Sequence, residues 1–174
     1  MIKGYQFPHL ADYEAKIALK NALFFPVFKV NYRGIPWAIS TDPQLARVGM
    51  TEAQAIRRYG KDAIALRQYF HSVSKAVITG ETTGLCKILV RRNGEILGAT
   101  IVGAEAGELI SAIALAMRQK LKISAIADLP HISPTLSEIV TQTAAQWNNL
   151  RLSNNTFLQD LIENFFNLRR SWSS

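Results

Sequence analysis

The chain has 174 residues, of which 48% are hydrophobic and 19% are charged, an ordinary composition for a globular domain. Cys86 is the single cysteine, which excludes an internal disulfide, a Cys-x-x-Cys redox pair and a cysteine-rich zinc site. The N-terminal residues lack the features of a signal peptide, and no stretch approaches the roughly 18 apolar residues of a membrane-spanning helix. We therefore expect a cytoplasmic protein that needs neither disulfides nor metal to fold.

The net charge of +7 is unevenly distributed along the chain. Residues 47–92 carry nine Lys and Arg against three Asp and Glu, whereas residues 93–148 carry three against five. A basic segment of this kind could contact nucleic acid or an anionic membrane surface. Because its basic residues occur singly or in pairs and form no long run, we favour a solvated basic face and expect no nucleic-acid partner.

The N-terminal part of the sequence predicts one helix, one loop and one short strand. The helix is expected over residues 12–23, where apolar residues fall on helical spacing. Two prolines and a glycine predict a crossover loop over residues 24–37. Residues 37–40 form a short apolar strand, and residues 41–49 are expected to turn at Asp42-Pro43.

The middle of the sequence carries the clearest local signals. Residues 51–59 predict a helix with Thr51 as its N-cap, and residues 63–70 predict a strand. Two β-rich runs, residues 84–92 and 95–103, are joined by Asn93-Gly94, the pair that a type I′ hairpin turn needs. This hairpin indicates an antiparallel sheet.

The C-terminal part predicts helices. Residues 108–119 form an unusually apolar helix, residues 123–127 a short helical turn, and residues 136–147 a further helix. A polar hinge over residues 148–155 precedes an amphipathic stripe. Strands in tandem and helices gathered on one face of the sheet predict an α+β fold.

Four separated stretches, in order and in register, resemble a single known domain. They are residues 40–55, the hairpin at 84–97, residues 98–117 and the Ser-Pro-Thr-Leu-Ser-Glu segment at 133–138. They are similar to the C-terminal interface, or dimerisation, domain of the FAD-dependent pyridine nucleotide-disulfide oxidoreductases. Within that family they most resemble members like mercuric reductase and dihydrolipoyl dehydrogenase. Residues 4–15 resemble the last flavin-domain segment of the mercuric-reductase-like branch.

The resemblance implies a division of the chain and a function. Residues 1–33 would be a remnant of the flavin domain with a crossover loop, residues 34–148 the interface domain, and residues 149–174 a hinge and amphipathic helix. FAD, NAD(P) and a redox disulfide are implied for a full-length relative. This chain has no Gly-x-Gly-x-x-Gly motif and one cysteine, so we expect no cofactor in it and no catalysis by it alone.

We therefore expect a dimerisation module that pairs with a second copy of itself and with the missing flavin and nucleotide domains. The apolar helix at 108–119 and the loop after it would supply the interface. The alternative is a module that binds nucleic acid or an anionic membrane surface through residues 47–92. Binding of that kind would weaken steeply as the salt concentration rises.

The resemblance also implies a catalytic loop. In the family a His before the Pro-Thr pair exchanges protons and a following Glu orients it, although mercuric reductase has a Tyr there. Here Ser133 replaces the His and Glu138 keeps the orienting position; a serine hydroxyl is no base near neutral pH. His131 would face the same side if the segment is extended, which makes it a candidate substitute. Thr135 and Glu138 also form a capping-box pattern, so we expect a helix start carrying a catalytic loop whose base is lost.

Other candidate residues have weaker patterns. His9 lies in the stretch that resembles a flavin-contacting segment, but Pro8 stands where relatives usually have Thr, so His9 is taken as a remnant flavin contact or a helix-start residue. Cys86 is expected to be a small packed side chain and His71 a surface residue. The stripe in residues 156–174 could lie on a membrane, although packing on a partner is favoured. No residue is assigned to a metal.

Overall fold

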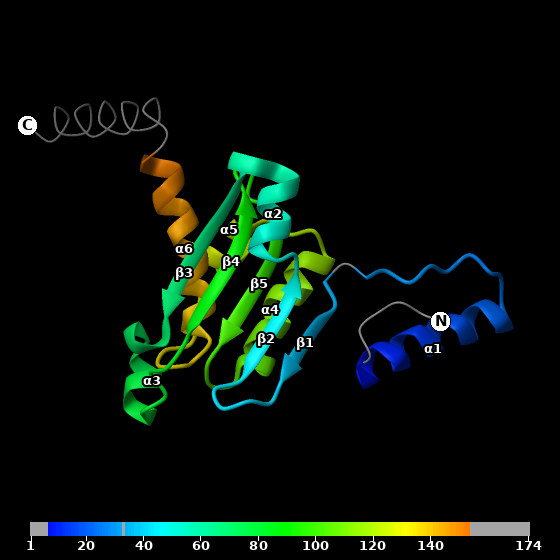
Figure 1. Cartoon of the computed structure of the whole chain (residues 1–174), viewed down its shortest axis with the longest axis horizontal. Coiled ribbons are helices and arrows are strands. Elements are labelled where there is room, and N and C mark those ends of the chain that lie inside the picture. The colour runs from blue at the N-terminus through cyan, green and yellow to red at the C-terminus, as the bar shows by residue number, and fades with distance from the viewer. Residues whose placement is uncertain (1–6, 33, 154–174) are drawn as a thin grey trace, which may run out of the picture.

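The computed structural model describes residues 7–32 and 34–153. An antiparallel sheet of five strands forms its centre (Figure 1). In spatial order the strands are β1 (Pro36–Ile39), β2 (Leu45–Gly49), β5 (Ile96–Val102), β4 (Leu85–Arg91) and β3 (Ala63–Tyr69). The helices are α1 (Pro8–Leu23), α2 (Glu52–Tyr59), α3 (Ser74–Thr79), α4 (Ala106–Arg118), α5 (Ile123–Ala127) and α6 (Glu138–Ser153), with 3-10 turns at Gly60–Asp62 and Phe70–Ser72.

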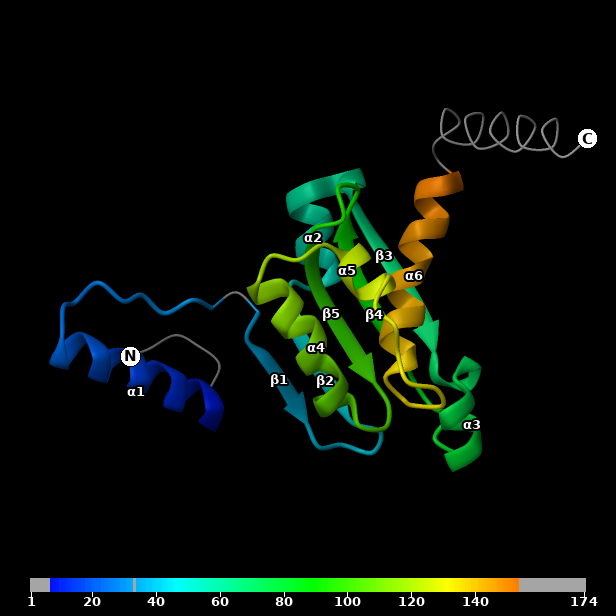
Figure 2. The same cartoon turned by 180° about the vertical axis from the view of Figure 1, so that it is seen from behind.

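One face of the sheet carries the main core. Strand register places Ala46 beside Ile101 and Ile101 beside Cys86, and all three side chains are fully buried. Helix α4 packs on β1, β2 and β5, while α6 packs on β3 and β4, so the two long helices cover this face side by side (Figure 2). The fold is therefore α+β, with its principal helical layer on one face, as the sequence predicts.

The opposite face of the sheet is covered at one end only. Helix α2 buries Ala55 against Leu89 and Leu97, which project from β4 and β5 away from the main core. The predicted N-cap Thr51 is confirmed: its side chain accepts the Gln54 N–H at 3.0 Å, and the Gln54 side chain accepts the Thr51 N–H at 2.9 Å.

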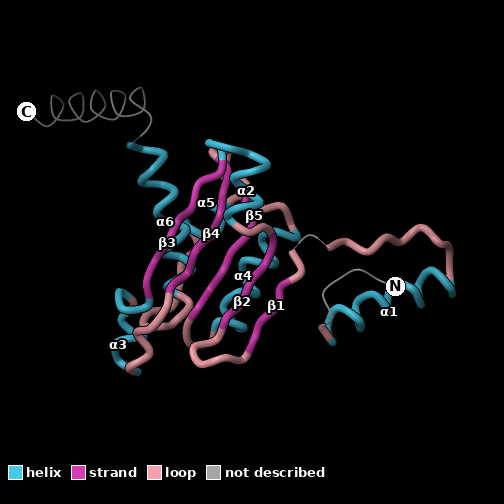
Figure 3. Tube along the Cα trace, viewed as in Figure 1, coloured by secondary structure: helices cyan, strands magenta, loops and turns pink. Residues whose placement is uncertain are grey.

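The prediction of a turn over residues 41–49 is wrong for its second half. Residues 45–49 form β2, paired with β1 on one side and β5 on the other (Figure 3). The run is short and has Arg47 in its middle, so its alternation of buried Ala46 and Val48 is weak as a sequence signal. Neighbouring strands on both sides complete its hydrogen bonds, and this tertiary pairing overrides the local pattern.

The β4–β5 hairpin is confirmed, but its turn is of another type. The Arg91 N–H donates to the Glu95 carbonyl at 2.9 Å and the Gly94 N–H donates to the Arg91 carbonyl at 2.8 Å, which makes a three-residue loop. Gly94 has φ +82°, whereas Asn93 is not at positive φ. A type I′ turn needs positive φ at both residues, so this is a type I turn followed by a glycine bulge.

Four differences concern the helices. Helix α1 begins at Pro8, four residues before the predicted start. The six-residue helix α3 is not predicted, because its apolar residues have no clear period. Helix α4 begins at Ala106, two residues before the predicted start. Helix α6 begins at Glu138 and continues to Ser153, through most of the stretch predicted as a polar hinge. The predicted stripe in residues 156–174 lies outside the described residues. Within the part that the structure describes, no helix is long and apolar enough to cross a membrane.

Candidate functional site

The predicted catalytic loop connects α5 to α6 on the helical side of the sheet (Figure 2). His131 and Ser133 are both exposed there. The same loop exposes two aliphatic side chains, Leu129 at 58% and Ile132 at 80%. Exposed aliphatic residues beside a polar loop are typical of a surface that another protein covers.

Glu138 is buried, with 5% of its surface exposed. Its Oε1 accepts the Thr135 N–H at 2.8 Å, which is one half of the predicted capping box. The other half is absent, because the Glu138 N–H donates to the Thr135 carbonyl at 3.4 Å rather than to the Thr135 hydroxyl. That hydroxyl donates to the Ile132 carbonyl at 2.8 Å. Since α6 begins at Glu138 itself, Thr135 lies before the N-cap position, and Glu138 fixes the path of the loop into the helix.

The structure does not join the predicted base candidates to Glu138. Among the described residues, neither the His131 ring nor the Ser133 hydroxyl makes a hydrogen bond, and the carboxylate is directed to the Thr135 backbone. His131 and Ser133 are therefore open to a partner outside the described part of the chain, and their catalytic roles stay predictions.

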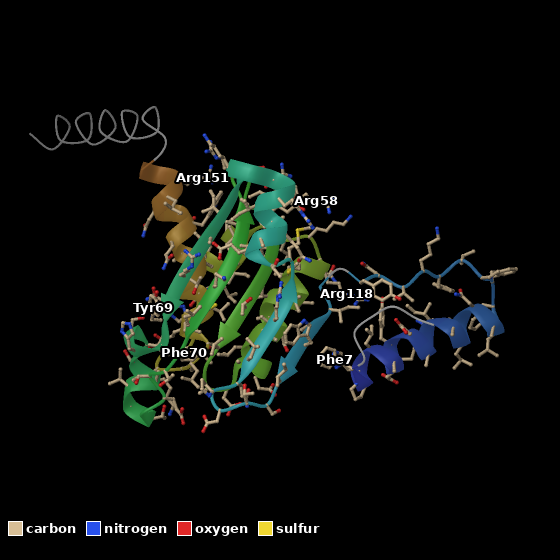
Figure 4. All side chains as sticks on the ribbon, in the orientation of Figure 1. Phe7, Arg58, Tyr69, Phe70, Arg118 and Arg151 are labelled. Atoms are coloured by element: carbon tan, nitrogen blue, oxygen red, sulfur yellow. The ribbon has the colours of Figure 1, made fainter. Side chains whose placement is uncertain are left out.

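His9 lies at the junction of α1 with the domain. Its Nε2 is 2.8 Å from the Pro36 carbonyl, and its ring stacks on Phe7 with centroids 5.6 Å apart. Phe7 in turn stacks on Trp37 at 5.9 Å. Figure 4 shows Phe7 between α1 and the sheet. A hollow of about 490 Å³ opens beside these rings and extends to Gly107 at the start of α4.

This hollow is not a complete flavin site. Its described walls offer aromatic rings, Ala, Pro and Ile side chains and the backbone of Gly107. They include no cation and no glycine-rich turn, the groups that hold the phosphates of a dinucleotide. His9 already uses a ring nitrogen on Pro36. The residues present could border one edge of a flavin ring, and no chemistry is assigned to them here.

Cys86 is a packed core residue, as the sequence predicts. It is fully buried on β4, and this burial raises the pKa of its thiol to about 12, partly offset by a hydrogen bond with Thr143. A thiol with such a pKa stays protonated near neutral pH and is a poor nucleophile. Among the described residues, no group of three or more His, Cys, Asp or Glu could hold a metal ion.

The basic segment at 47–92 is partly neutralised by its own carboxylates. Glu52 on α2 accepts from Arg67 at 2.7 Å and from Lys87 at 2.9 Å, across the outer face of the sheet. The hydrogen bond from Lys87, followed by that from Arg67, lowers the pKa of the Glu52 carboxyl. These cations thus hold α2 to the sheet, and nothing in the structure favours the alternative of a nucleic-acid or membrane-surface module.

Helix α4 has an exposed stripe, and the sequence does not predict which of its residues form it. Seven of its residues are buried, whereas Ser111, Ala112 and Leu115 face outward, and Leu115 is 59% exposed. Their spacing of one, three and four residues keeps them on one side of the helix. The apolar composition hides the stripe, because Ala and Leu occur on both sides of the helix.

Comparison with known proteins assigns the domain. Residues 35–144 match the family described as the dimerisation domain of pyridine nucleotide-disulphide oxidoreductases. Dihydrolipoyl dehydrogenase of Bacillus subtilis is 37% identical over 145 residues, which are 83% of this chain and 30% of that protein. The Synechocystis dihydrolipoyl dehydrogenase is 36% identical over 138 residues, 77% of this chain and 29% of that protein. The chain thus spans about 30% of the length of these curated relatives.

Solved structures agree with these sequence matches. The HOCl-induced flavoprotein disulfide reductase RclA of Escherichia coli, in its Cu(II) complex, superposes with a TM-score of 0.76 at 25% identity, over 82% of this chain and 33% of that one. LpdA of Mycobacterium tuberculosis gives a TM-score of 0.75 at 25% identity, over 83% and 31%. The predicted resemblance is confirmed at the level of the family, while the closer likeness to mercuric reductase stays a prediction. The chain belongs to the family of pyridine nucleotide-disulphide oxidoreductase dimerisation domains.

Proposed function

We propose that this domain pairs with a second copy of itself about a twofold axis, through the helical side of the sheet. The observation that carries the proposal is the exposed stripe of Ser111, Ala112 and Leu115 on α4, a helix whose seven other apolar side chains are buried in the core. A twofold interface brings the same patch of both copies together, so such a patch must complement itself.

An antiparallel pair of α4 helices satisfies this requirement. Ser111 and Ala112 are small, which lets two helix backbones approach closely. Glu108 is exposed in the first turn of α4, and Lys120 is exposed just after its end. In an antiparallel pair these opposite charges from the two copies lie near one another, so the charge pattern also complements itself.

The loop before α6 extends the same surface. Leu129 and Ile132 are exposed on it, and the loop lies on the same side of the sheet as α4 (Figure 2). A stable interface buries about 1,600 Å² in total, more than one helix stripe provides. The loop would supply further apolar area, and it would bring Ser133 and His131 to the second copy.

Light scattering of the purified chain tests the pairing. We expect a mass of twice 19.4 kDa for the unaltered chain and a monomer for Leu115→Glu, because a carboxylate in the helix contact has no partner. Ile78→Glu is the matched control, since Ile78 is an exposed aliphatic residue on α3, at a distance from the stripe. A monomeric unaltered chain, or equal loss of dimer in both variants, contradicts the proposal.

We further propose that α1 packs on the flavin domain of a longer parent flavoprotein, whose other domains hold FAD and NAD(P). Its support is the resemblance of residues 4–15 to a flavin-domain segment and the apolar side chains that α1 and its following loop expose, Leu19, Leu23, Phe24, Phe25 and Phe28. Amide hydrogen exchange can be measured in this chain and in the parent flavoprotein. The α1 amides should exchange fast in this chain and slowly in the parent protein. Equal exchange in both rules out the packing.

In such a parent protein, we propose that the loop between α5 and α6 takes part in catalysis without an imidazole next to Pro134, where Ser133 stands. Ser133→His should then raise the rate of disulfide reduction, because it restores a group that exchanges protons near neutral pH. His131→Gln should leave that rate unchanged. A large loss in His131→Gln would instead show that His131 replaces the missing base.

A further inference from the structure

A second hollow lies at the end of the sheet where β4 turns into β5. It has a volume of about 340 Å³ and lies between that turn, the start of α5 and the last part of α6. Figure 4 shows Arg151 near the end of α6, above the sheet. The hollow shares no residue with the α4 stripe, the catalytic loop or the hollow beside His9.

Three cations from three separate segments line this hollow: Arg92 from the hairpin turn, Lys122 from the link before α5, and Arg151 from α6. No carboxylate lies on its wall among the described residues. Within that part of the chain, none of the three side chains forms an ion pair. Like charges brought together on a concave surface repel one another, and an anion between them relieves that repulsion.

The nearest carboxylates are already engaged elsewhere. Asp62 accepts from the Arg91 Nε at 2.7 Å and from the Arg92 backbone N–H at 3.0 Å. These two hydrogen bonds, with a smaller contribution from the charge of Arg92, lower the pKa of the Asp62 carboxyl. Glu95 pairs with Arg91 at 3.2 Å, and Asp128 accepts from Asn148 at 3.2 Å. Arg91 thus occupies two carboxylates that would otherwise neutralise the cations of the hollow.

The walls of the hollow are tied together by the backbone. Glu95 and Lys122 form an isolated antiparallel bridge, and the Ile123 N–H donates to the Gly94 carbonyl at 2.9 Å. The Lys122 stem lies over Gly94, within 3.6 to 3.8 Å of where a Cβ would stand. These contacts fix the hairpin turn that carries Arg92 against the link that carries Lys122 before any ligand binds, which lowers the entropy cost of binding.

We propose that this hollow binds a small molecule bearing a phosphate group. The two arginines offer planar forks that match phosphate oxygens, and Lys122 adds a point charge. Ser124 and Asn93 line the hollow as neutral donors. The side-chain oxygen of Asn93, Oδ1, accepts from the Glu95 N–H, so the side-chain NH₂ of Asn93 is left to donate. Trp147 supplies an apolar wall. The volume lies in the range of small-molecule sites and is too confined for a nucleic-acid duplex.

Calorimetric titration of the 174-residue chain with pyrophosphate tests this site. We expect saturable binding that weakens as ionic strength rises, and at least about tenfold weaker binding in Lys122→Gln and in Arg151→Gln, the loss that follows from one missing charge-assisted hydrogen bond. Arg57→Gln is the matched control: it removes the same charge from exposed α2, on the other face of the sheet, and should bind as the unaltered chain does. The solution mass of each variant shows that the proposed pairing is unaffected.

The proposal is overturned if pyrophosphate shows no saturable binding, or if Arg57→Gln weakens binding as much as the two hollow variants do. Tighter binding of duplex DNA than of pyrophosphate overturns it as well, in favour of a nucleic-acid surface. Sedimentation with phosphatidylcholine vesicles containing phosphatidic acid distinguishes two sources of the phosphate group. Retention that pyrophosphate abolishes supports a lipid headgroup, whereas binding of pyrophosphate without retention supports a soluble molecule.

Discussion

Helices α1 and α4 both carry apolar side chains, but their surroundings are opposite. Helix α4 has 13 residues, seven of them buried between the sheet and neighbouring helices. Helix α1 has 16 residues, of which only Leu10 is buried among those the structure describes. It touches the domain through its N-terminal half, by way of His9 on Pro36 and Tyr13, which accepts a hydrogen bond from Arg118 at 3.0 Å. Figure 4 shows Arg118 at the side of the domain that faces α1. Exposed apolar side chains on a helix with few contacts inside the domain are the features on which the proposed packing against a flavin domain rests.

Chemical labelling should give the largest contrast, between the core on which α4 packs and the exposed helix α1. The Cys86 thiol in the core has its pKa raised to about 12 by burial, so at pH 8 about one molecule in ten thousand carries a thiolate. We expect Ellman's reagent to react with it only after unfolding, whereas the thiol introduced on α1 by Leu19→Cys should react like a free cysteine. The ratio of the two rates measures the contrast; equal rates would show that the core around Cys86 opens freely.

The same thiol gives a pH dependence. Its folded-state pKa lies above the unfolded value near 8.5, so its contribution to stability is complete below pH 8.5 and is lost as the pH rises toward 12. Urea midpoints measured from pH 7 to pH 10 should therefore fall less in Cys86→Ala than in the unaltered chain.

Truncation of one side chain in each helix should give the next largest difference. Ile113→Ala should lower the free energy of unfolding by about 2–5 kcal/mol, because Ile113 is fully buried and its loss leaves a cavity. Leu19→Ala should change it by less than about 0.5 kcal/mol, because Leu19 is 58% exposed. Urea denaturation of both variants measures the two changes. A large cost for Leu19→Ala would mean that α1 is covered within this chain or by a second copy.

Helix α2 is intermediate between α1 and α4 in how firmly it is held. The difference between its variant and the control should be smaller than that between Ile113→Ala and Leu19→Ala. The helix also buries only Ala55, but Glu52 ties it to Arg67 and Lys87 of the sheet. Glu52→Gln should cost less than about 1 kcal/mol at pH 7, because the ion pairs are partly exposed. Glu81→Gln, an exposed carboxylate on the α3–β4 loop with no ion pair among the described residues, is the control.

The acid dependence of that variant follows from the lowered pKa of Glu52. The stabilisation by the ionised Glu52 carboxylate is complete above pH 4.5, the pKa of this group in the unfolded chain. It is lost as the pH falls through the lower pKa of the folded state. The unaltered chain and Glu52→Gln should therefore differ at neutral pH and converge in acid, as denaturation midpoints across pH 2–7 would show. A difference that persists at pH 2 would assign the effect to packing.

Local sequence signals predict the elements that form by local rules. The capping box at Thr51, the helix at α4 and the β4–β5 hairpin all rest on residues close in sequence. Strand β2 is missed because its strand character comes from β1 and β5, which pair with it from distant positions. The end of α6 is missed because polar residues there resemble a hinge, although Trp147 and Leu150 pack against the core.

The candidate sites divide in the same way. The resemblance to the family points to the loop with His131, Ser133 and Glu138, and the structure shows that Glu138 serves the loop backbone. No sequence signal points to the phosphate hollow, because Arg92, Lys122 and Arg151 are far apart along the chain and each reads as a solvated surface cation.

The amino-acid sequence alone determined the α+β class, the dimerisation-domain family, the single packed cysteine and the serine at the expected base position. The family came from the resemblance of four stretches to a known domain, and the other features depend on local periodicity, composition and residue identity. None of them needs knowledge of distant contacts. Only the tertiary structure decided which side of α4 is exposed and where cations of residues 47–92 find carboxylates. It also decided that Arg92, Lys122 and Arg151 line one hollow. Each of these depends on side chains from separate segments meeting in space, and sequence spacing carries no measure of that distance.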